Sequence, residues 1–204
     1  MAPSKKNKKP VQAQVQAIIS AADAGLFATT VTLAEAFLKE NPSSVRAWLD
    51  LGHALTCLCR YDDAIAAYQT AIGLAEDAGQ NPDGIHSELG QLYRQRGDFE
   101  SAANSFQNQI DANPDDAAGY LMKATLLLQS GRSDQAIETL VRAVDCPTGV
   151  KEEVHFSLGT AYRSQGELVR AREQFQQAVS ISPDYAPAKT ALKDTKSAIS
   201  AGQN

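Results

Sequence analysis

The stretch AWLDLGHALTCLCRYDDAIAAYQTAI, residues 47–72, decides the fold of this chain. Its apolar residues recur at spacings of three and four, which is the period of an amphipathic α-helix. Small residues, Gly52 and Ala64, stand among them and would let two paired helices approach closely. The stretch therefore predicts two helices packed against each other.

The same pattern returns along the chain. A Leu-Gly pair, or a weaker copy of it, recurs at intervals of 38, 34 and 35 residues. The four copies are Leu51-Gly52, Leu89-Gly90, Lys123-Ala124 and Leu158-Gly159. A flat ring stands three residues before each copy: Trp48, His86, Tyr120 and His155. Self-similarity at such a period is the signature of a repeat architecture.

The second half of each copy also keeps its pattern. A small residue is followed four positions later by a bulky one: Ala64 and Tyr68, Ala102 and Phe106, Ala136 and Leu140, Ala171 and Phe175. Gly97, Gly131 and Gly166 fall where the first helix of a pair should end. The first interval is four residues longer than the next, which indicates a longer helix or loop at residues 73–83.

These four in-phase copies resemble the tetratricopeptide repeat family over residues 45–184. The resemblance implies an all-α fold, a right-handed superhelical solenoid of antiparallel helix pairs with a concave groove. We expect four repeats at residues 45–82, 83–116, 117–151 and 152–184. A disordered basic arm at residues 1–10, a degenerate helix pair at 11–44 and a capping helix with a tail at 185–204 are expected outside them.

Composition excludes several classes of protein. The net charge of −5 argues against a nucleic-acid-binding body, and no apolar stretch is long enough for a transmembrane helix. Three cysteines are too few for a disulfide framework, so a cytoplasmic protein is expected. The four lysines among residues 1–10 are a weak signal whose binding role stays open.

The sequence also offers no catalytic centre. It contains no phosphate-binding glycine loop, no His-Glu-x-x-His and no Gly-x-Ser-x-Gly. His53, Cys57 and Cys59 lie close in sequence, but no further Cys or His cluster completes a metal site. We therefore predict no enzyme activity, no cofactor and no metal.

The family resemblance places the binding surface on the first helix of each pair. The positions offset from the packing residues are the predicted groove: Arg46, Leu49, His53, Gln91, Arg94, Thr125, Leu128, Phe156 and Arg163. The chain lacks the Lys, Asn and Arg set with which some family members bind chaperone tails, so that class of ligand is not expected. Its scattered arginines and apolar strip favour a peptide with acidic and apolar residues.

The predicted function is therefore a non-enzymatic scaffold or adaptor that binds a protein or peptide in the concave groove. Two alternatives stay open. The chain could self-associate as a structural or assembly protein, which would make it a homo-oligomer, or serve as the regulatory subunit of a separately encoded enzyme. Neither nucleic acid nor membrane is expected as a partner.

Overall fold

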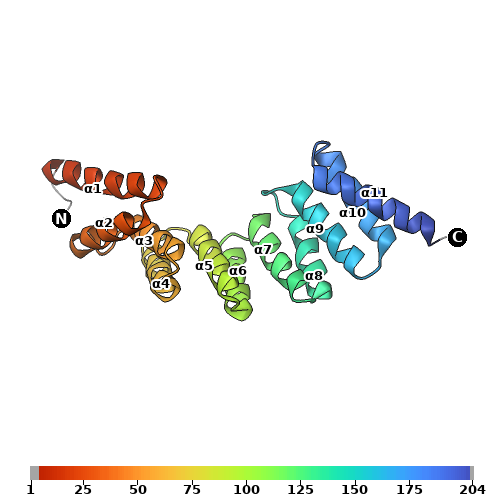
Figure 1. Cartoon of the computed structure of the whole chain (residues 1–204), viewed down its shortest axis with the longest axis horizontal. Coiled ribbons are helices and arrows are strands. Elements are labelled where there is room, and N and C mark those ends of the chain that lie inside the picture. Colours follow the sequence, from red (N-terminus) through yellow and green to blue (C-terminus); the bar gives the residue numbers. More distant parts are fainter. Residues whose placement is uncertain (1–4, 203–204) are drawn as a thin grey trace. The chain divides into compact units, whose positions relative to one another are not determined.

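The computed structural model describes residues 5–202, with side chains from Val11 onward, and these residues are helical apart from turns and short loops. The predicted all-α class is confirmed. Within the described range no strand forms, and a single bridge joins Asp116 to Thr148. The helices are labelled in Figure 1. Their bounds are α1 Lys5–Asp23, α2 Phe27–Glu40, α3 Val45–Cys57, α4 Tyr61–Asp77, α5 Asp83–Arg96, α6 Phe99–Ala112, α7 Ala117–Gln129, α8 Ser133–Val144, α9 Lys151–Ser164, α10 Leu168–Ile181 and α11 Ala186–Ala201.

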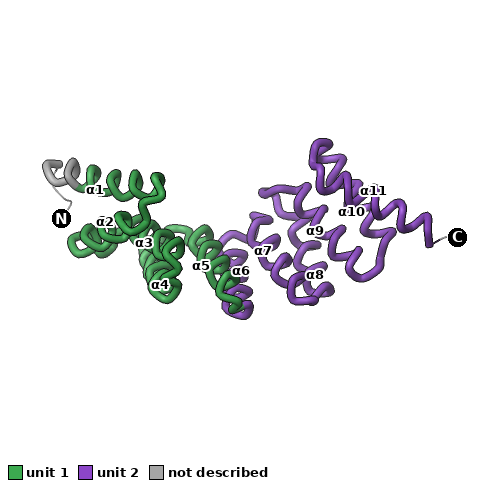
Figure 2. Tube along the Cα trace, viewed as in Figure 1, with its two compact units in different colours: residues 1–98 green, residues 99–204 purple. Residues whose placement is uncertain are grey.

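The chain divides into two compact units, residues 1–98 and residues 99–204 (Figure 2). The division falls in the turn between α5 and α6, inside the second predicted repeat. Helices α1 and α2 occupy the expected degenerate pair at residues 11–44. The expected disordered arm lies outside the described residues at positions 1–4. At positions 5–10 that expectation differs from the structure, because α1 begins at Lys5.

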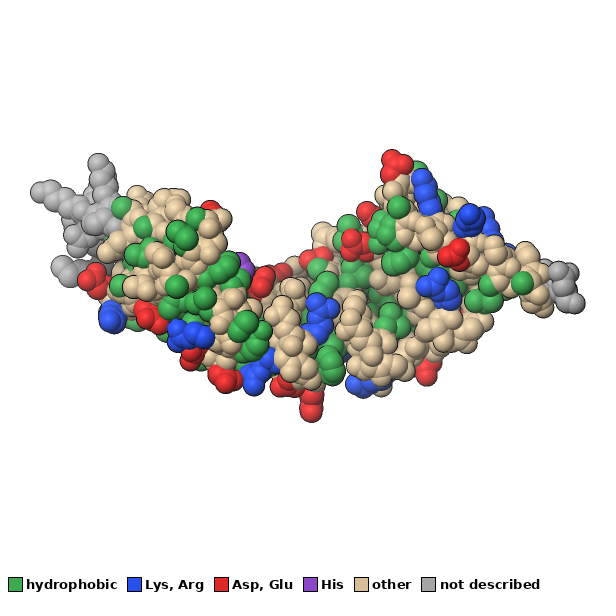
Figure 3. Space-filling view, viewed as in Figure 1, with side chains coloured by type: hydrophobic (Ala, Val, Ile, Leu, Met, Phe, Trp, Pro, Cys, Tyr) green, Lys and Arg blue, Asp and Glu red, His purple; other side chains and the backbone are tan. Residues whose placement is uncertain are grey.

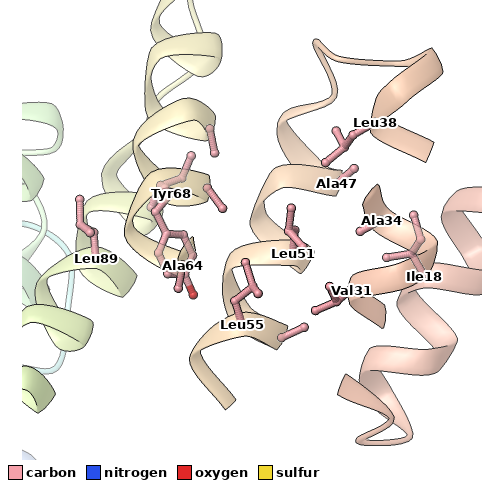
Figure 4. Close-up of a cluster of buried hydrophobic side chains, with 14 of the residues drawn as sticks. Ile18, Val31, Ala34, Leu38, Ala47, Leu51, Leu55, Ala64, Tyr68 and Leu89 are labelled. Carbon is pink, nitrogen blue, oxygen red and sulfur yellow. The ribbon is translucent and has the colours of Figure 1, made fainter. Parts of the chain in front are cut away.

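The core of the first unit is made by the repeated small and bulky residues. Figure 4 shows Leu51 and Leu55 of α3 lying between the residues of α2 and those of α4. The buried ring of Tyr68 packs directly on Gly52, where an added Cβ would meet Tyr68 Cε1 at 2.9 Å. Gly159 stands in the same relation to Phe175, at 2.7 Å in the second unit. Gly52 and Gly159 therefore leave space for a ring from the partner helix.

Three of the four rings that stand three residues before the Leu-Gly pair, or before its weaker copy, make a side-chain hydrogen bond. Trp48 Nε1 donates a hydrogen bond of 2.8 Å to the carbonyl oxygen of Pro42, six residues earlier. Tyr120 Oη does the same to the carbonyl of Pro114 at 3.3 Å. His155 instead shares a hydrogen bond of 2.8 Å with Gln174. His86 is buried, and its Nδ1 has no partner within the described residues.

The turn inside each helix pair contains one residue with a left-handed backbone. The residues are Gly25, Cys59, Gly97, Gly131 and Gly166, with φ between 58° and 78°. In each turn the next amide closes the helix end, as when Arg60 N donates to Leu55 O at 2.9 Å. Cys59 adopts this conformation without being glycine, so the first repeat carries backbone strain that the others avoid.

Helix α11 packs against α10 at the end of the second unit. Ala188 and Leu192 are buried there, while Lys189, Lys193 and Lys196 are exposed. The apolar stripe expected of a capping helix therefore faces the preceding repeat.

Candidate functional site

Residues 73–83, which make the first repeat interval the longest, form one wall of a cleft in the first unit. Helix α4 has 17 residues, whereas α6 and α10 have 14 each. The helix ends where Gln80 N donates to Ala75 O at 2.8 Å, and a short loop leads to α5. The extra residues at 73–83 thus form the last turn of α4 and the loop beside it.

The cleft has a volume of about 460 Å³ and lies between α3, the end of α4 and α5. That size is typical of a site that takes a small ligand or one or two peptide side chains. Its lining residues are Val45, Leu49, Asp50, His53, Tyr68, Ala75, Gln80, Asn81, Asp83, Gly84, Ile85 and Glu88. On the face of the first unit in view in Figure 3, hydrophobic, acidic and basic side chains are interspersed.

The bottom of the cleft is apolar. Leu49 is half-buried against the core of the unit, and Ile85 is buried opposite it on α5. Burial, the largest cause, raises the pKa of Tyr68 to about 12, and the charge of Glu88 acts in the same direction. Tyr68 is therefore a neutral phenol at physiological pH, and the floor can accept an uncharged side chain.

The rim of the cleft is acidic. Arg46 Nε donates to both carboxylate oxygens of Asp50 at 3.0 Å, which raises the pKa of the Arg46 guanidinium. Asp83 begins α5, and Glu88 is exposed one turn further along. None of the residues that line the cleft is lysine or arginine. The carboxylates at this rim would attract a positive charge.

Among the residues with described side chains, His53 has no neighbours that could complete a metal site. Its ring lies edge-on to Phe27, with centroids 6.4 Å apart, and Cys57 and Cys59 are exposed free thiols. In the part of the chain with described side chains, no three His, Cys, Asp or Glu residues are grouped so that they could hold a metal ion.

The structure brings only two of the nine predicted groove residues, Leu49 and His53, into this cleft, with Arg46 held at its edge by Asp50. Gln91 and Arg94 lie further along α5 and are half-buried. On α7, Thr125 Oγ1 donates to Leu121 O at 2.8 Å, and Leu128 packs against the core of the second unit.

The two predicted groove residues on α9 stabilise the second unit. Phe156 packs between Phe175 and Tyr185, with ring centroids 5.7 and 5.5 Å away. The guanidinium of Arg163 lies 5.5 Å from the centroid of the Phe175 ring. Phe156 is half-buried and Arg163 is exposed, so the prediction that they meet a ligand stays a prediction.

The sequence analysis missed the residues that α5 and the preceding loop contribute: Gln80, Asn81, Asp83, Ile85 and Glu88. Their signal was the four-residue lengthening of the first interval. It was interpreted only as a longer helix or loop and not as the wall of a site.

A second cleft of about 520 Å³ lies in the other unit, between α6, α7 and the start of α8. Lys123, which replaces the leucine of the repeat, reaches into it and donates to Gln107 Oε1 at 2.6 Å. None of the predicted groove residues lines this cleft. It reflects the departure of the third repeat from the pattern.

No helix within the described residues is long and apolar enough to cross a membrane.

Two family models, both described as tetratricopeptide repeat, match residues 43–108, 87–150 and 121–186. Among curated proteins, the Arabidopsis thaliana protein CTR9 homolog is 27% identical over 103 residues, which are 50% of this chain and 9% of that protein. The Rattus norvegicus DnaJ homolog subfamily C member 3 is 26% identical over 98 residues, or 48% of this chain and 19% of that protein. The chain thus spans less than a fifth of the length of either relative.

Among solved structures, MamA superposes with a TM-score of 0.69 at 20% identity, covering 83% of this chain and 90% of that one. YrrB, described as a tetratricopeptide repeat protein with an unusual peptide-binding site, superposes with a TM-score of 0.67 at 16% identity. That match covers 93% of this chain and 95% of YrrB. At these identities the likeness shows a shared fold.

Proposed function

Since the chain belongs to the tetratricopeptide repeat family, we propose that it is a non-enzymatic scaffold that binds a peptide segment of another protein in the cleft between α3 and α5. The fold supports protein–protein interaction in general, and the cleft supplies a specific place for it. A cytoplasmic location suits this proposal.

The observation that carries the proposal is the cleft of about 460 Å³, whose lining combines apolar residues such as Leu49 and Ile85 with polar ones such as Gln80 and His53. Binding sites combine an apolar floor with a few polar groups that fix orientation. A segment that inserts one apolar side chain beside Leu49 would bury it between two helices. Side chains such as Gln80 and His53 could then hold the neighbouring backbone.

The shape of the cleft favours an extended segment over a helix. It runs between two helices and is closed on one side by the end of α4. An extended chain points every second side chain the same way, so one enters the cleft while the side chains two positions away face its rim.

The proposal is tested by selecting binders from a random short-peptide library on the immobilised protein. Recovered peptides should lose at least about tenfold in affinity, or 1.4 kcal/mol, for Leu49→Ala. Leu58→Ala is the matched control, because Leu58 is exposed just beyond the end of α3 and outside the cleft. Circular dichroism and Trp48 fluorescence show whether each variant is folded.

Two results would reject the proposal. One is a selection that yields no peptide above background. The other is a set of binders whose affinity drops equally for Leu49→Ala and Leu58→Ala, because a ligand held elsewhere would not distinguish these residues.

A further inference from the structure

We infer that the ligand of the α3–α5 cleft is a basic peptide, with lysine or arginine flanking the apolar residue that enters the floor. This inference rests on the proposed function and names the chemistry of the partner. It reverses the charge expected from the scattered arginines of the sequence.

The first unit carries an acidic excess. Residues 11–98 include eleven Asp and Glu but only five Lys and Arg, and Lys5, Lys6, Lys8 and Lys9 bring the net charge of residues 1–98 to −2. Three of the five basic residues are in ion pairs: Arg46 with Asp50, Arg60 with Asp63 and Arg96 with Asp62. Lys39 and Arg94 remain, and neither lines the cleft. The lining of the cleft therefore contains acidic side chains and no basic one, and its charge would attract a cationic segment before contact.

Three of the residues that line the cleft are acidic. Glu88 is exposed on α5 and Asp83 begins the same helix, whereas Asp50 on α3 is buried and its charge is offset by Arg46. A lysine two positions from an inserted apolar residue would reach the rim where Glu88 stands. An acidic residue at the same place would meet Glu88 with no cationic side chain among the lining residues to offset the repulsion.

The arginines that suggested an acidic ligand do not oppose this inference. Arg46 is held by both oxygens of Asp50, and Arg163 lies over Phe175 in the second unit. Arg94 is half-buried on α5 outside the lining of the cleft. Their charges are thus not directed at a ligand in this site.

The test compares three fluorescein-labelled peptides that differ only in two flanking residues. The basic probe is Gly-Ser-Lys-Ala-Leu-Ala-Lys-Ser-Gly, and the other two carry Gln or Glu in place of both lysines. Fluorescence polarisation with the full chain should show the basic probe binding about fivefold more tightly than the Gln probe, the ratio expected of one exposed ion pair. High salt should remove that ratio, because it screens exposed charges.

Glu88→Lys should reverse the order, so that the Glu probe binds most tightly. Glu138→Lys on α8 is the control: it makes the same change in net charge at an exposed site outside the cleft, and the order should persist. Leu49→Ala should weaken all three probes alike.

Equal affinity for the three probes, or preference for the Glu probe, would overturn the inference while leaving peptide binding in place. An unchanged order in Glu88→Lys would overturn it as well. If library peptides bind but the basic probe does not, the charge assignment is wrong. If neither library peptides nor probes bind, the proposed function fails, and the inference fails with it.

Discussion

Replacing Gly52 by alanine tests the idea that a ring from the partner helix sets the identity of this position. The new Cβ would lie 2.9 Å from Cε1, 3.0 Å from Cδ1 and 3.1 Å from Cζ of Tyr68. The Tyr68 ring is buried and belongs to the core of the first unit. Either α3 and α4 must separate locally, or the ring must leave its rotamer.

The magnitude follows from two opposing contributions. Overpacking a core by one methyl group typically costs about 1–3 kcal/mol. Alanine in place of glycine inside a helix stabilises the helix by about 1 kcal/mol. Gly52→Ala should therefore reduce the free energy of unfolding of the first unit by about 1 kcal/mol. Gly73→Ala is the matched control, because Gly73 lies inside α4 and nothing would stand within 4 Å of its new Cβ. That variant should be more stable than wild type by up to about 1 kcal/mol.

Urea unfolding followed by tryptophan fluorescence measures both variants. Trp48 is the single tryptophan of the chain and lies one turn from Gly52, so its signal reports the first unit. With a slope of about 1 kcal/mol per molar urea, the two variants should differ in midpoint by about 2 M.

A double variant identifies the contact. The third repeat has Ala124 where the first has Gly52, and Leu140 where the first has Tyr68, and both are buried. Tyr68→Leu should therefore relieve the clash, so that the double variant is no less stable than Tyr68→Leu alone. If Gly52→Ala stabilises as Gly73→Ala does, or if the two costs simply add, the ring does not restrict this position and the reasoning is refuted.

Three further outcomes are expected. Burial lowers the pKa of His86 below its ordinary value of 6.5, so the unfolded chain takes up the proton first. The free energy of unfolding of the first unit should decline as the pH falls below 6.5 and become constant below the pKa of folded His86. Urea midpoints measured across this pH range should lose that decline in His86→Phe. Cys59→Gly should stabilise the same unit by about 1 kcal/mol by relieving the left-handed backbone, whereas an unchanged urea midpoint would mean that the turn stores no strain. Truncation after Asp184 should expose the face around Phe175 and lower the stability of the second unit by several kcal/mol. Amide exchange in α9 and α10 should then be faster than in the full chain, and equal exchange would show that α11 is no cap.

The sequence by itself determined the class and the period of this fold. Residues such as Leu51, Gly52 and Tyr68 recur at helical spacing, and each serves a contact that neighbouring elements make with one another. Because repeats pack against adjacent repeats, a local pattern is enough to predict the helix pairs and the buried stripe of α11. The turn glycines were predicted for the same reason, since a helix end needs a left-handed residue within a few positions.

Only the tertiary structure decided which surface residues meet and which of them stay free. Phe156 and Arg163 occupy groove positions of the pattern, and the structure adds contacts that spacing did not predict: Phe156 packs on Phe175 and Tyr185, and Arg163 lies over Phe175. Leu49 and His53 line a cleft because the longer α4 places Ala75 and the loop before α5 beside them. The division of the chain between α5 and α6 likewise left no mark in the repeat pattern. Spacing along a helix determines which face of the helix a residue occupies. Whether that residue can contact a partner depends on the side chains packed around it, and these are set by the lengths and packing of whole helices.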